Sequence, residues 1–163
     1  MIILGIDPGL AITGFGVIKY EKNNFKAIQY GVIRTPSKTP LPDRLVKIQE
    51  GIHTLVKQYN PDCAAIEELF FNTNAKSAFL VGQARGVAVV TIASAGLPIY
   101  EYTPLQVKQG VAGYGRADKN QIQQMVKTLL NLKEIPKPDD AADALAIAMC
   151  HAHTGHFQQL FSV

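Results

Sequence analysis

Residues 3–18 read ILGIDPGLAITGFGVI, and this stretch decides the fold. Two apolar runs rich in Ile, Val and Phe flank a short connection, which predicts two neighbouring antiparallel strands. The first run ends abruptly on Asp7, which is followed by Pro8 and Gly9. A strand that enters a core keeps its charges at its ends, so Asp7 either begins a turn or is presented to a ligand. The positions of the other acidic residues in the chain indicate which of these two roles Asp7 has.

The remaining sequence predicts a mixed sheet covered by helices. Strands are expected at 2–7, 13–21, 25–34, 62–68 and 97–102, with the first three forming an antiparallel meander. Apolar residues between Leu41 and Leu55 recur at spacings of four and three, which indicates one face of a helix that ends before Asn60. Further helices are expected at 74–95, 118–132 and 140–153. The fold class is therefore α/β, with a mixed five-stranded sheet, three antiparallel strands followed by two parallel ones, and helices on both faces.

Length and composition indicate one soluble domain. With 163 residues, 47% of them hydrophobic, the chain can bury one core, so we expect a single domain over 1–153. The tail, 154–163, is left open between order and disorder. The formal charge of +3 permits a polyanionic partner without demanding one. The apolar stretch 78–97 is long enough for a membrane span, but Gln83 and Arg85 interrupt it, so a buried or interface helix and no membrane association are expected.

Two cysteines and the N-terminus bear on the compartment. Cys63 and Cys150 are far apart in apolar runs, where a buried, reduced thiol is the ordinary interpretation. MIILGID has neither the basic segment nor the cleavage site of a signal peptide. The sequence therefore predicts a cytoplasmic protein.

Acidic residues recur where predicted elements begin or end. Glu67 and Glu68 end the fourth strand as Asp7 ends the first, and ligands gather at the carboxyl ends of parallel strands. Asp140 and Asp143 are three residues apart, which places them on one face of a helix. Asp143 is surrounded by Ala, Leu and Ile, and no Lys or Arg follows Lys137. A carboxylate held in such surroundings needs a counter-charge, which a metal ion would supply.

Each of these acids taken alone has a structural alternative. Asp-Pro-Gly is a good turn sequence, and acids in the first turn of a helix interact favourably with its dipole. Taken together they form an oxygen-only cluster, which suits Mg²⁺ or Mn²⁺ and does not suit zinc. The histidines 151, 153 and 156 are expected to be surface residues, because 151 and 153 point to nearly opposite sides of a helix.

Long motifs in the chain resemble the RuvC-type Holliday junction resolvases, crossover junction endodeoxyribonucleases of the ribonuclease H-like superfamily. The motifs are ILGIDPG with TGFGVI, AIEELFF with NAKSAFLVGQARGV, YEYTPLQVKQGVAGYGRADKNQIQQMV and DAADALAIAMCHA. The resemblance implies a ribonuclease H-like fold and a homodimeric, Mg²⁺-dependent endonuclease in homologous recombination and DNA repair. Such an enzyme nicks two opposing strands of a four-way DNA junction symmetrically and leaves 5′-phosphate and 3′-hydroxyl ends.

The resemblance also assigns roles to individual residues. By matching position, the catalytic and metal-binding acids are Asp7, Glu67, Asp140 and Asp143, with two divalent ions at the site and Mn²⁺ able to replace Mg²⁺. Two neighbours compete for these roles. Glu68 lies beside Glu67, but a strand alternates faces, so only one of the two can point at the site. Asp139 lies beside Asp140, and only Asp140 has the three-residue spacing to Asp143.

DNA-contacting residues follow from the same motifs. Matching positions are Lys108, Lys119 and Phe70, and Arg116 lies between the two lysines in the glycine-rich GYGRA segment. For each lysine the alternative is a solvated surface charge, and for Phe70 it is a cap on the core; we expect Phe70 to act as a wedge at the junction. The 74–95 helix, rich in small residues, is the first candidate for the homodimer interface. A branch-migration helicase complex of the RuvA and RuvB type is implied as a partner.

Two other functions fit parts of the sequence. The first hairpin also looks like the phosphate-binding hairpin of actin-type ATPases, but these need two such domains and the chain holds one. A non-catalytic junction-binding module would have no need of Asp143 in an alanine-rich helix. A junction-cleavage assay with Mg²⁺ or EDTA separates these functions.

Overall fold

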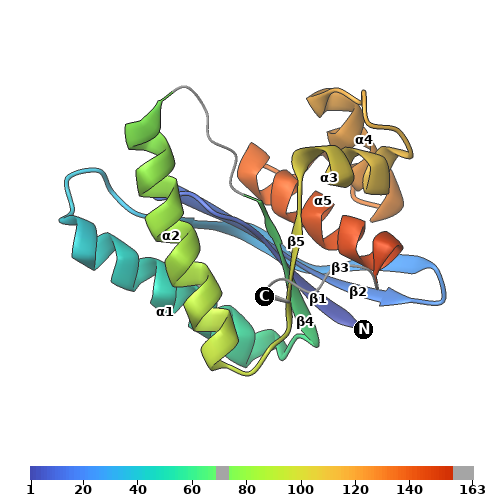
Figure 1. Cartoon of the computed structure of the whole chain (residues 1–163). Helices are drawn as coiled ribbons and strands as arrows, with labels where there is room; N and C mark the ends of the chain where they lie inside the picture. The colour runs from blue at the N-terminus through green and yellow to red at the C-terminus, as the bar shows by residue number, and fades with distance from the viewer. Residues whose placement is uncertain (69–73, 156–163) are drawn as a thin grey trace.

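A computed structural model describes residues 1–68 and 74–155 and shows a five-stranded sheet between two layers of helices (Figure 1). Phe70, which the sequence predicts to act as a wedge at the junction, lies outside these residues. The elements in chain order are β1 (Ile2–Asp7), β2 (Ile12–Glu21), β3 (Asn24–Arg34), α1 (Leu41–Tyr59), β4 (Cys63–Glu67), α2 (Ala75–Ser94), β5 (Ile99–Tyr102), α3 (Pro104–Ala112), α4 (Lys119–Leu129) and α5 (Asp139–Thr154).

The strand order is β3-β2-β1-β4-β5. β1, β2 and β3 pair antiparallel, whereas β4 runs parallel to both β1 and β5. This topology confirms the predicted mixed sheet of three antiparallel strands followed by two parallel ones. In the register of the central pair, Ile6 lies beside Ile66, so β1 and β4 end at the same edge of the sheet.

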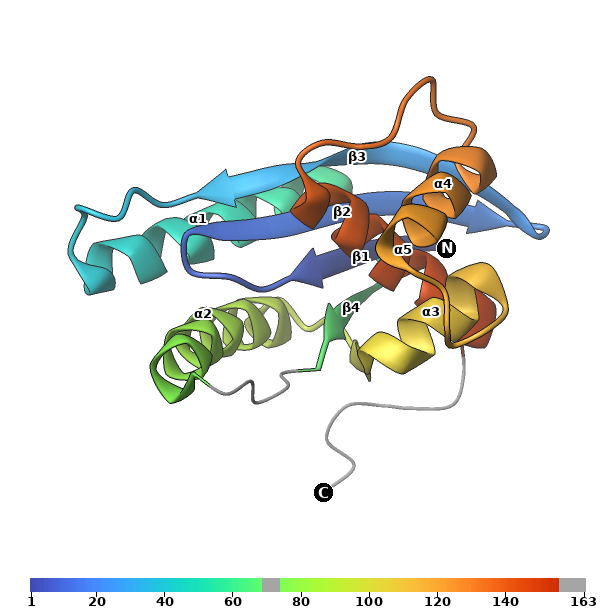
Figure 2. The same cartoon turned by 90° about the horizontal axis from the view of Figure 1, so that it is seen from above.

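Each face of the sheet carries its own core. α1 and α2 cover one face, where Leu4, Ile6 and Ile66 pack with residues of both helices. α5 covers the other face, with α3 and α4 outside it, and its core includes Ile3 and Leu145 (Figure 2). The central strands are therefore buried on both faces, which explains the continuous apolar run of β4.

Glycines let α5 approach the sheet closely. A Cβ on Gly5 would overlap the carbonyl oxygen of Ala144, and a Cβ on Gly14 would overlap that of Asp140. Alanines on the α5 side of this contact keep the two backbones within reach of each other. The beginning of α5 is consequently fixed against the ends of β1 and β2.

Three features differ from the sequence expectations. α3 was not expected; its signals are Pro104 in the first turn and a capping box in which Thr103 and Gln106 bond each other's backbone N–H groups. α4 ends at Leu129 rather than at 132. His151 is a core residue rather than a surface one, because it is 1% exposed, with Nδ1 2.6 Å from the Tyr102 hydroxyl and its ring stacked on Tyr100.

α2 is less buried than the sequence indicates. It is the helix among residues 1–68 and 74–155 that is long and apolar enough to cross a membrane, by length and composition only. Its central Arg85 is ion-paired with Glu101 of β5, and Ala84 and Ala88 are buried against the rest of the domain. Phe79, by contrast, is 67% exposed. α2 is therefore a layer of this fold that leaves apolar side chains uncovered.

Candidate active site

Asp7 and Glu67 are held side by side by the central strands. Both end their strands, and β1 and β4 are parallel neighbours in matching register. Side chains alternate along a strand, and Ile6 and Ile66 belong to the core beneath α1 and α2, so Asp7 and Glu67 face α5. Burial, followed by the charges of Glu67, Asp143 and Asp140 in that order, raises the pKa of Asp7 to about 8. The pKa of Glu67 is raised by burial and then by Asp143.

The two aspartates of α5 reach the same place. Asp140 lies in the first turn of α5, where its backbone rests on Gly14, the β2 partner of Asp7 in the sheet register. Asp143 follows one turn later and is half-buried. Burial raises the pKa of Asp143; the charge of Lys119 opposes this rise and that of Asp140 adds to it. The structure therefore brings together all four acids that the sequence singles out.

The counter-charge beside Asp143 comes from Lys119, the first residue of α4. The Nζ of Lys119 lies 3.6 Å from Asp143 Oδ2 and 3.1 Å from Asp139 Oδ2. The expectation that a metal ion supplies the counter-charge of Asp143 is thus incomplete, because Lys119 supplies one within the chain. Sequence reasoning missed this contact because Lys119 and Asp143 belong to different helices, and no local spacing relates them.

The two rival acids lie elsewhere. Glu68 is exposed, and its backbone N–H donates a hydrogen bond to the carbonyl of Tyr102. Asp139 is exposed and faces α4, where Lys119 and Gln123 contact it. Hydrogen bonds from these two side chains lower the pKa of Asp139. These placements favour Glu67 and Asp140 as members of the acid cluster.

The donor set suits a hard divalent cation. It contains carboxylate oxygens, the ligands that Mg²⁺ and Mn²⁺ prefer. Among the residues that the structure describes, no three acidic, His or Cys side chains converge at metal-binding distances. The raised pKa values of Asp7, Glu67 and Asp143 nevertheless indicate mutual repulsion and burial, both of which a bound cation would offset. Asp7, Glu67, Asp140 and Asp143 are the residues that would hold it.

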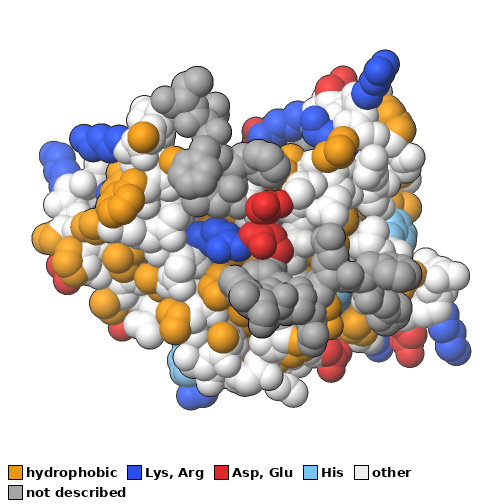
Figure 3. Space-filling model, viewed as in Figure 1, with side chains coloured by type: hydrophobic (Ala, Val, Ile, Leu, Met, Phe, Trp, Pro, Cys, Tyr) orange, Lys and Arg blue, Asp and Glu red, His pale blue; other side chains and the backbone are white. Residues whose placement is uncertain are grey.

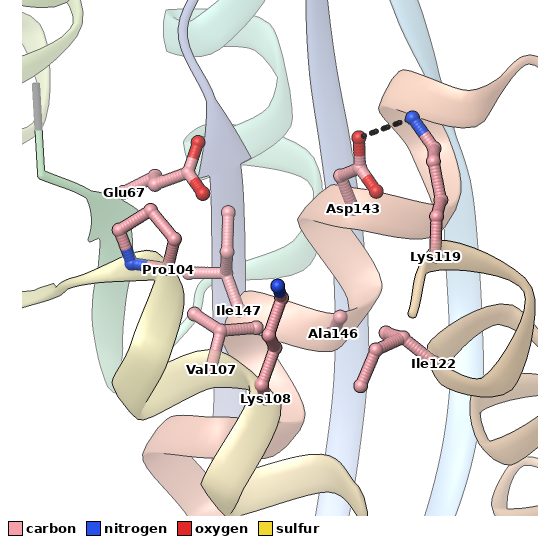
Figure 4. Close-up of a pocket in the computed structure, with 9 residues that line it drawn as sticks. All are labelled: Glu67, Pro104, Val107, Lys108, Lys119, Ile122, Asp143, Ala146 and Ile147. Carbon is pink, nitrogen blue, oxygen red and sulfur yellow. Dashed lines mark ion pairs between the residues drawn. The ribbon is translucent and has the colours of Figure 1, made fainter. Parts of the chain in front are cut away.

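A cavity of about 220 Å³ opens beside the acids (Figure 4). Its floor is apolar and its rim carries two acids and two lysines; the lining residues are Glu67, Pro104, Val107, Lys108, Lys119, Ile122, Asp143, Ala146 and Ile147. Lys108 projects from α3 toward the space between Glu67 and Asp143. The cavity thus places cationic groups next to the carboxylates, as a site for an anionic substrate requires.

The other predicted DNA contacts are less enclosed. Arg116 is exposed in the connection between α3 and α4, and it is not among the described residues that line the cavity. Lys108 belongs to α3, which precedes the glycine-rich connection. Phe70 lies outside the described residues.

Comparison with known proteins agrees with this geometry. The family described as crossover junction endodeoxyribonuclease RuvC matches residues 3–151. The chain is 65% identical to a protein of that description from Alkaliphilus oremlandii, over 100% of this chain and 99% of the relative. It is 58% identical to one from Clostridioides difficile, over 98% and 94% of the two chains.

The fold agrees as closely. The solved structure of Thermus thermophilus RuvC in complex with Holliday junction substrate superposes with a TM-score of 0.91 at 37% identity, covering 95% of this chain and 94% of that one. The range that the family matches, 3–151, contains Asp7, Glu67, Asp140 and Asp143. The chain belongs to the RuvC family of crossover junction endodeoxyribonucleases.

Proposed function

We propose that this chain is a structure-specific endodeoxyribonuclease that resolves four-way DNA junctions in recombination and repair. It nicks two opposing strands symmetrically and leaves 5′-phosphate and 3′-hydroxyl ends. The observation that supports the proposal is the matching register of β1 and β4, which holds Asp7 and Glu67 side by side, with Asp143 close enough to raise the pKa of both, in a member of this family. Family membership supports dependence on a divalent metal.

The acids would hold two Mg²⁺ ions, with Mn²⁺ able to replace them. When bound, such a pair activates a water molecule on one side of a phosphodiester and stabilises the leaving 3′ oxygen on the other. Asp7 is the proposed shared ligand, because it is the acid whose pKa the other three all raise. Glu67 is the proposed ligand from β4, and Asp140 and Asp143 are the proposed ligands from α5.

Basic residues draw the phosphates to this negative site. Lys108 and Lys119 line the cavity next to the carboxylates, so either ammonium can contact a phosphate group that is bound beside the acids. Arg116 is the proposed contact farther from the reaction. Phe70 remains a proposed wedge between bases at the exchange point, since it follows the strand that carries Glu67.

A homodimer supplies one active site for each strand that is cut. α2 supports this proposal, because Phe79 and Val90 are exposed on it, and Figure 3 shows hydrophobic side chains spread over the side that α1 and α2 form. Its small residues contribute less than the sequence suggests: Ala84 and Ala88 are buried within the chain. The interface is therefore proposed to use the large exposed side chains of α2.

Further proposals concern the setting of the enzyme. The nuclease domain spans 1–153, and α5 extends one residue beyond that boundary. The protein works in the cytoplasm on chromosomal DNA, without a membrane. A branch-migration helicase complex of the RuvA and RuvB type delivers the junction.

The test is cleavage of three substrates under matched conditions. A four-way junction, a linear duplex of the same sequence and ATP are each incubated with the protein and Mg²⁺ or EDTA. We expect paired nicks in the junction with Mg²⁺ and none with EDTA. Asp7→Asn, Glu67→Gln and Asp143→Asn should lose cleavage but keep junction binding, because they remove charge that repels phosphate. ATP hydrolysis without nicking, or binding without nicking, would instead support the ATPase or the non-catalytic module.

A further inference from the structure

Lys119 is shared between a catalytic acid and an acid outside the cluster. Its Nζ is nearer to Asp139 Oδ2, at 3.1 Å, than to Asp143 Oδ2, at 3.6 Å. Asp139 also accepts a hydrogen bond from Gln123 Nε2 at 3.1 Å. Gln123 follows Lys119 by four residues on α4, so both side chains lie on the same side of that helix. Asp139 therefore contacts two side chains of α4, those of Lys119 and Gln123. Lys119 contacts two carboxylates of α5, those of Asp139 and Asp143.

Asp139 and Asp143 differ in what else they serve. Asp143 faces the other acids, which is seen in the pKa of Glu67 and of Asp7. The side chain of Asp139 is 52% exposed and points away from that cluster toward α4. A divalent ion that binds Asp143 competes with the ammonium of Lys119 for the same carboxylate, whereas Asp139 stays free to keep its lysine.

We propose that Asp139 is a positioning residue, which retains the Lys119 ammonium at the edge of the acid cluster when a metal ion takes Asp143. The inference rests on the proposed function, because the retained ammonium is one of the two that are proposed to contact the phosphate of the substrate. Without Asp139, a long lysine side chain released from Asp143 has also lost the nearer of its two ion pairs, and ordering it on the substrate costs conformational entropy. Gln123 supports the arrangement by fixing the Asp139 carboxylate.

An isolated surface ion pair would have no such role, because such pairs contribute little to stability. The pair of Lys119 and Asp139 differs from an isolated one because both residues have a further contact. Lys119 also contacts Asp143, a proposed metal ligand, and Asp139 also accepts a hydrogen bond from Gln123. The proposal therefore concerns where Lys119 lies when metal is bound, rather than how stable the protein is.

The first test follows Lys119 without DNA. The protein is treated briefly with an amine-reactive reagent, and mass spectrometry compares modification of Lys119 with that of Lys133, an exposed lysine that precedes α5. In the wild type we expect Lys119 to react more slowly than Lys133 in EDTA and to remain slower in Mg²⁺. In Asp139→Asn, Mg²⁺ should bring Lys119 up to the rate of Lys133. Glu134→Gln is the matched control, because it removes an exposed negative charge from the same connection.

Two results of this test overturn the proposal. One is a wild-type Lys119 that becomes as reactive as Lys133 when Mg²⁺ is added, since Asp139 then does not retain it. The other is an Asp139→Asn protein whose Lys119 behaves as in the wild type. Thermal melting in EDTA checks that each variant is folded.

The second test is a double-mutant cycle on the single-turnover cleavage rate at saturating junction binding and Mg²⁺. Asp139→Asn should slow cleavage by about fivefold, and in a Lys119→Ala background it should change the rate by less than about twofold, because coupled residues are not additive. Asp139→Glu should restore most of the rate. An acid that merely repelled DNA would give the opposite sign, namely tighter binding and unchanged or faster cleavage in both backgrounds.

The two levels of failure are distinguishable. If the wild type does not nick junctions, the proposed function fails. If the wild type nicks them but the effects of Asp139→Asn and Lys119→Ala are additive, the positioning role alone is wrong.

Discussion

At the scale of the residue, Asp7 has opposite effects on folding and on function. Its carboxylate is the acid most affected by the others, and burial with like charges raises its pKa to about 8. Without a cation, ionising it in the folded protein is unfavourable. The chain therefore accepts a local loss of stability in order to present Asp7, a proposed metal ligand.

This conflict predicts a pH-dependent stability difference. In EDTA between about pH 4 and pH 8, the folded protein keeps the Asp7 proton and the unfolded chain releases it, so the free energy of unfolding falls as pH rises. Each unit of pKa difference is worth about 1.4 kcal/mol. Asp7→Asn removes this dependence. At pH 8 its melting temperature in EDTA should exceed that of the wild type by about 4 °C or more.

Calorimetry or circular dichroism between pH 5 and pH 9 checks this. Asp43→Asn, which removes an exposed charge in the first turn of α1, should follow the wild-type curve. Parallel curves for Asp7→Asn and the wild type would show that Asp7 ionises normally. Saturating Mg²⁺ should stabilise the wild type more at pH 8 than at pH 6, because metal binds the deprotonated acids.

A second residue-scale prediction concerns the lysines beside the acids. Lys108→Ala should weaken binding to junction and duplex alike, and should lower the steepness of the salt dependence by about 0.9 in the log–log slope if it removes one phosphate contact. Fluorescence anisotropy with labelled DNA across salt concentrations measures this in EDTA. Lys133→Ala, an exposed lysine away from the cavity, is the control. Identical slopes for both variants would mean that Lys108 is a solvated surface charge that makes no phosphate contact.

At the scale of the element, α5 is placed by the strand beneath it. The N-terminal turn that carries Asp140 rests on a glycine of β2, and this contact sets the distance between α5 and the strand-end acids. A methyl group at that position has no room unless the helix moves. The position of the acids is therefore encoded partly in residues that carry no chemistry.

Gly14→Ala should accordingly affect activity more than stability. Overpacking of this kind costs about 1–3 kcal/mol, while displacement of Asp140 by a fraction of an ångström should reduce single-turnover cleavage by about tenfold or more. A Gly14→Ala enzyme with wild-type cleavage would mean that α5 can shift without consequence for the site.

The sequence predicts the elements that depend on neighbouring residues, and it misses contacts between residues that are far apart in the sequence. The strands, α1 and the acid positions follow from hydrophobic period and from side chains at strand ends. α3 was overlooked although Thr103, Pro104 and Gln106 carry a helix-start signal, because a short apolar stretch after a strand resembles a loop. The burial of His151 could not be predicted, since its partners Tyr100 and Tyr102 belong to β5, which is distant from α5 in the sequence.

At the scale of the whole molecule, symmetry connects the enzyme with its substrate. A four-way junction offers two equivalent strands, and each chain of this size holds one acid cluster, so a two-fold dimer presents one cluster to each strand. The two cuts are then separate chemical events within one complex.

A mixed dimer tests this arrangement. One wild-type subunit and one Asp7→Asn subunit, carrying different tags, are purified as the heterodimer and given a junction with distinguishable strand labels. We expect nicking of one strand of the symmetric pair in each binding event. Cleavage of both strands by that heterodimer, or sedimentation showing active monomers at the working concentration, would contradict the model.

The two separate cores of the sheet bear on how such enzymes can change. The acids and lysines depend on the face beneath α5, whereas the uncovered apolar side chains of α2 belong to the opposite face. If the dimer forms through α2 as proposed, substitutions of the exposed side chains of α2 alter how far apart and at what angle two acid clusters are held, and the residues of each cluster stay unchanged. Selection or design could then change which branched DNA geometries are cut by substituting residues of α2 alone, while the acids and lysines of the active site stay the same.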